Sequence, residues 1–471
     1  MIRTALERLE SDPAREAVVG LDAGGGVCWR RSARQVLEAI GAWQAWLDLH
    51  GVKPGERVAL DLPRGPELLP AHLAVLASGA CAVPINPALS EHERARVLER
   101  AEARALLGAD AERPARGKPL RLVEAAADAP ALLIFTSGTT GEPKGVPLSR
   151  ENLEANLDGL AETWSLRPHE RLLHALPAHH VHGLVLALYG SARMGMPIWL
   201  MERFDAARAL DALAEHEIAV FMGVPTMYHR MLDAPRPDAP PPDAPGGEAL
   251  PSMRLFVSGS APLAEADFRG FESRFGFAPL ERYGLTETLI VASNPLDGRR
   301  IPGTVGRALP RTEIRLAENG EIEVRGPGVM RGYWRDEQTS AASFRDGFFR
   351  TGDLGEMHES GHLRISGRLR ELIIVGGSNV LPGEVEHALA GAEGVDELAA
   401  AGVPDADRGE IVGAFVVPQA GHDPAALRAL ETRLRERADR ELAPYKRPRV
   451  YRFLAELPRN AMGKVDRRSL R

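Results

Sequence analysis

The first 130 residues alternate between amphipathic stretches and short apolar runs. Helices are predicted after Ser32 with Gln35 and after Ser90 with Glu93, because each pair has the spacing of a capping box and precedes apolar positions three and four residues apart. The apolar runs that predict strands lie at 57–62, 81–85, 105–107, 132–135 and 255–257. Such alternation predicts a mostly parallel sheet covered by helices.

Beyond about residue 310 the pattern changes to short strands and then to a compact final unit. The short strands are predicted at 312–316, 321–324, 347–350 and 362–365. In the final unit, a helix that starts at Asp423-Pro424 lies between strands at 411–417 and 450–453. We therefore predict an α/β protein. Residues 1–367 form a large domain of helix-covered, mostly parallel sheets with a β-rich subdomain, and residues 368–471 form a small, mobile α+β lid domain.

Two stretches are predicted to be neither strand nor ordinary helix. The segment 183–201 is long and apolar, but Arg193 and several glycines interrupt it, so we expect a buried core segment and no membrane span. The segment 233–251 contains seven prolines and is expected to be a stiff surface loop within a domain.

Composition narrows the class of protein. The chain has 471 residues, of which 44% are hydrophobic, so it is not a disordered chain. A net charge of -7 argues against a nucleic-acid surface, which needs a basic stripe. Two cysteines, Cys28 and Cys81, are too few for a disulfide framework or a thiolate metal site. Without a signal or anchor segment, these features indicate a protein of the cytoplasm that has no membrane partner.

The densest chemical signal follows the apolar run ALLIF. The ten residues TSGTTGEPKG at 136–145 contain four hydroxyls, three glycines and one ammonium group. Glycines let backbone N–H groups approach an anion closely, and hydroxyls and a lysine add donors and positive charge. The motif does not match the Walker pattern. It predicts a loop that binds polyphosphate; the alternative is an ordinary glycine-rich turn.

Three further motifs are weak singly. The segment 281–288, ERYGLTET, places Tyr283 beside a glycine and Glu287 between hydroxyls, which suits a nucleobase and Mg²⁺. Upstream, 258–261 is a second small-residue loop after a strand and is not a nucleophile elbow. Asp353 and Arg368 could bind the hydroxyls of a ribose. Near the end, PRNAMGK places a lysine on a glycine-containing loop.

In this order, TSGTTGEPKG, YGLTET, RTGD, GRLRELIIVGG and PRNAMGK resemble the adenylate-forming superfamily of acyl-CoA synthetases, adenylation domains and firefly luciferase. The resemblance covers nearly the whole chain. It implies that a carboxylate attacks the α-phosphate of magnesium ATP, which gives an acyl-adenylate and pyrophosphate. The thiol of coenzyme A, the second co-substrate, then displaces AMP.

The resemblance also implies roles for individual residues. The catalytic ones are Lys464, Thr286 and Glu287, and Glu287 is the Mg²⁺ ligand. Lys464 would lie between the carboxylate and the α-phosphate, where a point charge offsets the repulsion of two anions. The residues expected to bind ATP or AMP are Thr136, Ser137, Gly138, Thr139, Thr140, Gly141, Lys144, Ser260, Ala261, Tyr283, Gly284, Thr286, Asp353, Arg368 and Lys464.

A rotation of the small domain between the two half-reactions is implied as well. Arg370 is the expected hinge, although many relatives carry aspartate there. After rotation, Gly376 and Gly377 would line the channel for the pantetheine thiol, since paired glycines admit a narrow chain beside the backbone.

The acid is predicted from a narrower resemblance. The stretches HHVHGLVLALYG, GVPTMYHRM, LFVSGSAPL and ERYGLTET resemble malonyl-CoA synthetases, in which the arginine at the position of Arg230 receives the distal carboxylate. His180 and Ser258 are expected to join Arg230 in binding the substrate. The three histidines at 179, 180 and 182 suggest a metal, but no cysteine or carboxylate cluster accompanies them, and the resemblance assigns the segment to the acyl pocket.

Malonate is therefore the expected substrate, with methylmalonate as the alternative. Other readings that stay open are an acyl-CoA synthetase for another short-chain, medium-chain or aromatic acid, and an acyl-AMP ligase that feeds a carrier protein. A silent nucleotide-binding protein would be expected to lose Lys464 or Glu287, and both are present. A serine hydrolase would need an elbow around Ser258 or Ser260, which the sequence lacks.

Overall fold

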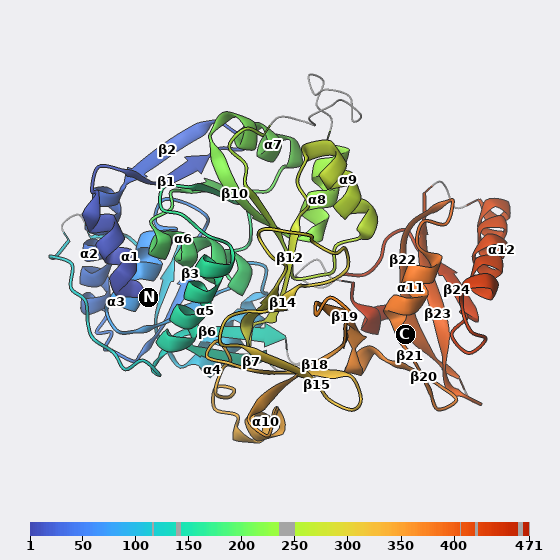
Figure 1. Ribbon diagram of the computed structural model, residues 1–471. Helices are drawn as coiled ribbons and strands as arrows, with labels where there is room; N and C mark the ends of the chain where they lie inside the picture. The colour runs from blue at the N-terminus through green and yellow to red at the C-terminus, as the bar shows by residue number, and fades with distance from the viewer. Residues whose placement is uncertain are drawn as a thin grey trace. The chain divides into compact units, whose positions relative to one another are not determined.

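The computed structural model describes residues 1–114, 117–137, 143–234, 250–405, 407–419, 423–459 and 465–470. The chain divides into two compact units, each described here by itself (Figure 1). The first unit comprises Met1–Ile314, Val324–Arg350 and Glu359–Leu363. The second comprises Arg315–Glu323, Thr351–His358 and Arg364–Arg471. The domain boundary predicted at residue 368 stays a prediction.

The larger sheet of the first unit has nine strands. In spatial order they are β14 (Arg307–Ala308), β13 (Leu289–Ser293), β12 (Leu280–Leu285), β11 (Leu255–Ser258), β10 (Ile218–Gly223), β8 (Arg171–His174), β9 (Ile198–Met201), β1 (Glu16–Leu21) and β2 (Val27–Ser32). Neighbours from β12 to β1 run parallel, and the pairs at both edges run antiparallel. The prediction of a mostly parallel sheet is confirmed.

A second sheet of five strands completes the frame of this unit. Its spatial order is β5 (Ala103–Gly108), β3 (Arg57–Asp61), β4 (Cys81–Pro84), β6 (Pro130–Ser137) and β7 (Pro143–Ser149). All neighbours are parallel except β6 and β7, which form an antiparallel pair. The apolar runs predicted as strands in this region are therefore strands.

Helices cover these sheets. Those of the first unit are α1 (Ile2–Ser11), α2 (Ala33–Leu49), α3 (Leu68–Ala77), α4 (Glu91–Ala101), α5 (Arg150–Thr163), α6 (Gly190–Met194), α7 (Ala206–Glu215), α8 (Pro225–Asp233), α9 (Glu265–Phe275), α10 (Glu337–Ala342) and the π-helix η1 (His182–Tyr189). Both predicted capping boxes, at Ser32 and Ser90, are present. Among the described residues, none of the helices has the length and apolar character needed to cross a bilayer.

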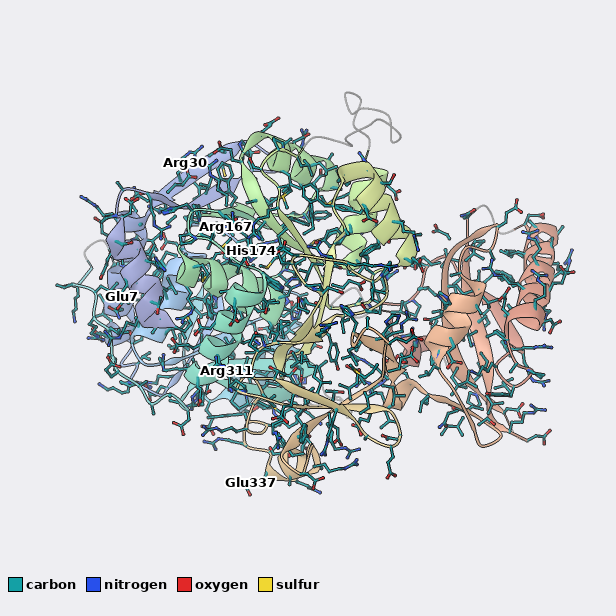
Figure 2. All side chains as sticks on the ribbon, in the orientation of Figure 1. Glu7, Arg30, Arg167, His174, Arg311 and Glu337 are labelled. Carbon is teal, nitrogen blue, oxygen red and sulfur yellow. The ribbon has the colours of Figure 1, made fainter. Side chains whose placement is uncertain are left out.

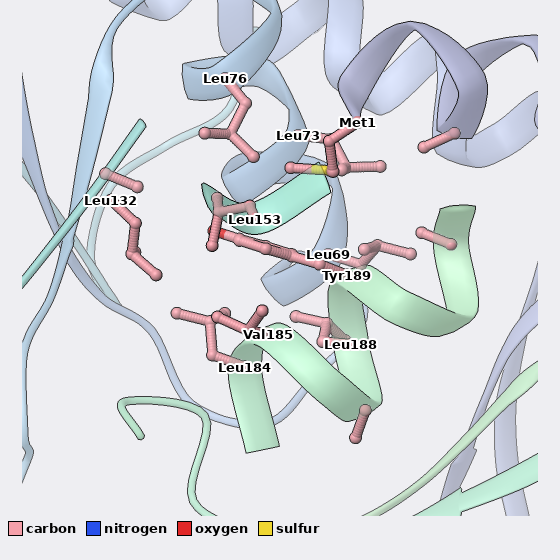
Figure 3. Packing of buried hydrophobic residues seen from close by; sticks show 14 of the residues in the cluster. Met1, Leu69, Leu73, Leu76, Leu132, Leu153, Leu184, Val185, Leu188 and Tyr189 are labelled. Carbon is pink, nitrogen blue, oxygen red and sulfur yellow. The ribbon is translucent and has the colours of Figure 1, made fainter. Parts of the chain in front are cut away.

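Alternate residues of the nine-stranded sheet face two different cores. Val18, Leu172 and Val220 belong to the larger core, which also contains residues of the five-stranded sheet. Their neighbours in sequence, such as Leu173 and Phe221, pack with α7, α8 and α9 on the other face. Figure 3 shows part of the larger core, where side chains from α3, α5 and η1 surround a buried tyrosine. The segment 183–201 is buried within this unit, as predicted.

The remaining strands form two more sheets. One contains β15 (Glu313–Leu316), β16 (Glu321–Arg325), β18 (Phe348–Met357), β17 (Phe344–Arg345) and β19 (Leu363–Arg368). The other, wholly in the second unit, contains β21 (Ser378–Val380), β20 (Ile373–Val375), β23 (Gly409–Pro418), β22 (Val395–Asp405) and β24 (Val450–Phe453). The latter sheet packs with the helices α11 (Pro382–Leu389) and α12 (Pro424–Glu441). Short 3-10 helices are η2 (Leu369–Glu371) and η3 (Arg467–Leu470).

Candidate active site

The predicted polyphosphate loop connects the two strands of a hairpin. Thr136 and Ser137 end β6, and Lys144 lies in β7 directly opposite Thr136. The Thr136 hydroxyl donates to the Lys144 carbonyl over 3.5 Å. The predicted loop residues Gly138, Thr139, Thr140 and Gly141 lie outside the described residues. The described strands thus bring the two ends of the motif together.

Lys144 and Glu287 meet the same tyrosine. The Lys144 Nζ lies 5.2 Å from the centre of the Tyr333 ring, and the Tyr333 hydroxyl donates to Glu287 Oε1 over 3.1 Å. Burial and the neighbouring Glu287 carboxylate raise the pKa of Tyr333. The phenol is therefore neutral and fixed as a donor, and it joins the expected phosphate ligand to the expected Mg²⁺ ligand. We call Lys144, Tyr333 and Glu287 the phosphate-side cluster.

The segment 330–334 holds Tyr333 in this place. The Met330 N–H donates to the Glu287 carbonyl over 2.8 Å, and the Trp334 N–H donates to the Gly145 carbonyl over 2.8 Å. A Cβ at Gly145 would lie 2.9 Å from the Trp334 Cβ, so this close approach requires glycine. Sequence reasoning missed Tyr333, because it is far from both partners along the chain and no local spacing relates the three.

Glu287 lies in a tight turn between β12 and β13. The Leu285 N–H donates to the Thr288 hydroxyl over 3.1 Å. A Cβ at Gly284 would lie 1.8 Å from the Leu289 carbonyl oxygen, so glycine is required there for backbone packing. Thr286 and Glu287 are partly exposed, whereas Tyr283 is buried at 8% exposure. The turn therefore presents Thr286 and Glu287 at the end of a buried strand.

Several predicted residues lie at the carboxyl ends of parallel strands. In register, Gly223 of β10 pairs with Ser258 of β11, and Ser258 pairs with Glu281 of β12. Ser258 is fully buried, and its hydroxyl has no hydrogen-bond partner among the residues that the structure describes. The chain then turns through Ser260, whose φ is +74°, to the exposed Ala261. This edge of a parallel sheet is where α/β folds bind their ligands.

A buried guanidinium lies at the same edge. Arg282 of β12 is 5% exposed, and its Nε and Nη2 have no hydrogen-bond partner in the described structure. Burial lowers its pKa to about 10, which still leaves the group charged at neutral pH. A Cβ at Gly259 would lie 2.4 Å from the Arg282 Cζ, so the glycine makes room for the guanidinium. Among the described residues, no carboxylate forms an ion pair with Arg282.

Two histidines extend the polar group that begins with this arginine: His182 lies near Arg282, and His174 lies near His182. His182, at the start of η1, is 5% exposed, and neither ring nitrogen has a hydrogen-bond partner within the part of the chain that is described. Burial, then the nearby charges of Arg282 and His174, lower its pKa well below the ordinary value. His174, in the interior at the end of β8 (Figure 2), contacts the Gly183 carbonyl through Nε2 at 2.8 Å. We call Arg282, His182, His174 and Ser258 the buried cationic cluster.

The predicted substrate residues His180 and Arg230 differ from this cluster in exposure. His180 is half-buried, and its ring lies 4.2 Å from that of His179, whose pKa burial lowers to about 3. Arg230 is exposed on α8 and has no ion-pair partner among the described residues. Its predicted role stays a prediction. No group of three metal-binding side chains occurs in the described part of the chain.

The second unit holds the expected ribose pair. Arg368 Nε lies 3.1 Å from Asp353 Oδ1, and the Asp353 carboxylate is buried. The Thr351 hydroxyl accepts from the Asp353 N–H over 3.1 Å and donates to the Ile322 carbonyl. The structure therefore brings together the two residues to which the family resemblance assigned the ribose.

The expected hinge and coenzyme A residues lie next in the chain. Arg370 is exposed in η2. Gly376 and Gly377, with φ of +54° and +83°, form the two-residue turn between β20 and β21. That turn needs positive φ at both positions, which explains the paired glycines locally. Lys464 lies outside the described residues.

Known proteins resemble this chain in sequence and in fold. Residues 6–334 match the family model of the AMP-binding enzyme, and residues 384–464 match that of its C-terminal domain. ATP-bound MatB from Rhodopseudomonas palustris is 35% identical, with a TM-score of 0.87 over 100% of this chain and 98% of that one. A sulfoacetate–CoA ligase from Cupriavidus necator is 40% identical over 73% of this chain and 67% of its own length. A malonate–CoA ligase from Arabidopsis thaliana is 34% identical over 73% of this chain and 60% of its own length, so the chain spans less than two thirds of that relative.

Proposed function

Since the chain belongs to the AMP-binding enzyme family, an acid–thiol ligase family that uses ATP and coenzyme A, we propose that it joins malonate to coenzyme A. An oxygen of the acid attacks the α-phosphorus of ATP, and pyrophosphate leaves. The thiol of coenzyme A then attacks the acyl carbon of malonyl-adenylate, and AMP leaves as the thioester forms. Methylmalonate is the alternative acid.

The observation that carries this choice is the buried charge of Arg282, which has no ion-pair partner within the described ranges of the chain. Leaving a guanidinium buried without a counter-ion costs several kcal/mol, and a bound anion offsets that cost. The far carboxylate of a short diacid supplies such an anion, whereas octanoate or a plain aromatic acid does not. The neutral His182 beside it offers a ring N–H as a second donor. We therefore expect Arg282, rather than Arg230, to bind the distal carboxylate.

Two kinds of relative support a substrate with two anionic groups. The similar malonate–CoA and sulfoacetate–CoA ligases are both named for acids that carry a second anionic group. A carboxylate and a sulfonate differ in shape and in number of oxygens, but each accepts hydrogen bonds from a guanidinium. Sulfoacetate therefore belongs in the substrate test beside malonate and methylmalonate.

The phosphate-side cluster suits the nucleotide. Lys144 offers positive charge to the outer phosphates, and Glu287 offers one carboxylate to Mg²⁺. Magnesium ions are commonly held by one or two carboxylates together with substrate phosphates, so a single carboxylate fits this ion. When bound, Mg²⁺ would neutralise phosphate charge; Tyr333 orients the Glu287 carboxylate. Asp353 and Arg368 would take the ribose, and Lys464 would offset charge at the α-phosphate.

A substrate panel tests the proposal. AMP formation would be measured with malonate, methylmalonate, sulfoacetate, acetate, butyrate and octanoate, with and without coenzyme A. We expect the highest kcat/KM for malonate, and full turnover only when coenzyme A is present. A preference for octanoate or butyrate would overturn the assignment to a diacid. Activated malonate that accumulates with coenzyme A present would instead favour an acyl-AMP ligase that feeds a carrier protein.

A further inference from the structure

One arginine in the second unit holds three separate elements together. The Arg467 Nη2 lies 2.8 and 3.0 Å from the two oxygens of Glu386, and its Nη1 lies 3.0 Å from Glu371 Oε2. Its Nε donates to the Ala400 carbonyl over 3.2 Å. All three guanidinium nitrogens are therefore used, and the side chains of the three charged residues are only 23–27% exposed.

Each partner of Arg467 belongs to a different part of the unit. Glu371 is the last residue of η2 and follows Arg370, the expected hinge. Glu386 lies in α11 and also accepts from the Ala400 N–H over 2.8 Å. Ala400 lies in β22. Arg467 therefore fixes the chain end relative to the hinge, to a helix and to the central sheet at once.

Arg467 lies three residues after Lys464, on a segment that is held close to the chain before that lysine. Arg459 and Val465 form an antiparallel bridge, and the Asp466 N–H donates to the Pro458 carbonyl over 2.8 Å. Val465 packs with Leu457 in an apolar cluster against β22 and β23. The two flanks of residues 460–464 are thus joined to each other, and Arg467 anchors the later flank.

We propose that Arg467 is a positioning residue, which holds the flanks of Lys464 in a fixed relation to the hinge through Glu371. This inference rests on the proposed function. A lysine ammonium on a flexible stem acts on a transition state only when its backbone is held, because a misplacement of about 1 Å costs roughly 100-fold in rate. A guanidinium that binds two carboxylates and a carbonyl provides that hold, which a lysine at the same position would not reproduce.

The three-way contact also predicts different roles for its two acids. Both carboxylate oxygens of Glu386 accept hydrogen bonds from Arg467. Glu386 also accepts a hydrogen bond from the backbone of β22, so it supports the fold of the unit. Among the described contacts of Arg467, Glu371 alone connects it to the hinge segment. Glu371→Gln therefore weakens the connection to the hinge while the anchors to α11 and β22 remain.

The experiment separates the two half-reactions in the full-length chain. Pyrophosphate release from ATP and malonate reports adenylation, and thioester formation from supplied malonyl-adenylate reports transfer. For Arg467→Met and Glu371→Gln we expect adenylation to fall roughly 30-fold and 10-fold, with transfer within twofold of the wild type. Glu431→Gln, which removes an exposed ion pair to Arg435 on α12, is the matched control and leaves both rates unchanged.

A second readout does not depend on turnover. Amine-selective labelling, followed by mass spectrometry, would give the labelling rate of Lys464 relative to that of Lys446. Lys446, which forms an ion pair with Glu384, is an internal reference in the same unit. We expect this ratio to change in Arg467→Met and Glu371→Gln and not in Glu431→Gln. An unchanged ratio, or an equal fall in both half-reactions, would overturn the inference. If the wild type releases no pyrophosphate with any acid, the proposed function fails, while the labelling ratio still tests the anchor.

Discussion

The phosphate-side cluster and the buried cationic cluster treat charge in opposite ways. Lys144 and Glu287 carry opposite charges, share one tyrosine and are partly exposed. Arg282 is buried near His182 and has no carboxylate partner among the described residues. In the phosphate-side cluster the protein supplies both a positive and a negative charge, so the cluster suits a ligand whose phosphates bind together with a metal ion. In the buried cationic cluster the charge of Arg282 has no counter-ion within the described ranges, so this cluster is stabilised most by a ligand that supplies an anion.

This contrast predicts that the two clusters act on different properties of the reaction. The phosphate-side cluster should affect every acid equally, because all acids share ATP. The buried cationic cluster should affect only acids with a second anionic group. Variants on the two sides therefore separate activation from acid choice, and the expected effects differ in size.

The largest effect is expected for Arg282→Met. Methionine is an unbranched apolar side chain of roughly similar length, so this substitution removes the charge and retains most of the packing. Without it, the far carboxylate would be buried unpaired, so kcat/KM for malonate should fall about 100- to 1,000-fold, equivalent to roughly 3–4 kcal/mol. Steady-state assays with butyrate beside malonate would show whether the monoacid is spared. Arg230→Ala, which removes an exposed arginine, is the comparison and should change kcat/KM for malonate less than threefold. A larger loss in Arg230→Ala than in Arg282→Met would show that Arg230 binds the distal carboxylate.

Glu287→Gln tests the other cluster. The amide keeps the size of the side chain and the bond to Tyr333 but loses the charge that Mg²⁺ prefers. We expect adenylation to fall roughly 100-fold with malonate and butyrate alike, and the Mg²⁺ concentration for half-maximal rate to rise. Glu313→Gln, at an exposed ion pair with Arg325, controls for loss of a carboxylate. A loss confined to malonate would break the separation between the clusters.

The pH dependence of stability probes the buried histidines. Burial lowers the pKa of His174 to about 4, below its ordinary value of 6.5. The unfolded chain therefore takes up this proton first, and the free energy of unfolding falls as the pH drops from 6.5 towards 4. At pH 5 this difference amounts to about 2 kcal/mol, at roughly 1.4 kcal/mol per pH unit.

His174→Gln removes that titration and keeps an N–H donor for the Gly183 carbonyl. Denaturant midpoints at pH 7.5 and pH 5 should therefore differ less in this variant than in the wild type. The same pH sensitivity in both chains would show that His174 does not titrate as its burial predicts.

The smallest effect is expected for Tyr333→Phe. This change removes one hydrogen bond to Glu287 and keeps the ring beside Lys144. Glu287 is partly exposed, so the lost hydrogen bond corresponds to the ordinary net value of about 0.5–1.5 kcal/mol, and adenylation should fall roughly 2- to 12-fold with each acid. Measured ratios of malonate to butyrate should stay constant. A change in that ratio would show that Tyr333 affects which acid the enzyme prefers.

The sequence by itself determined the helix starts, the buried strands and the family. Capping boxes at Ser32 and Ser90 are local patterns, and Asp353 and Arg368 could be paired because their motifs, RTGD and GRLRELIIVGG, resemble those of the family. The turn around Gly284 was also expected from the sequence, whereas the hairpin turn at Gly376 and Gly377 was found only in the structure.

Only the tertiary structure decided which charges remain without a partner. Arg282 and Glu281 are neighbours in sequence, yet the strand separates them: Glu281 accepts from the Leu263 N–H, while Arg282 lies against Gly259. Tyr333 reaches Glu287 only because segment 330–334 bonds to two elements that are distant in sequence. Burial and pairing depend on contacts between remote segments, and no spacing along the chain encodes them. The sequence indicated the chemistry of the site, and the fold buried a guanidinium, Arg282, that has no ion-pair partner in the part of the chain that the structure describes.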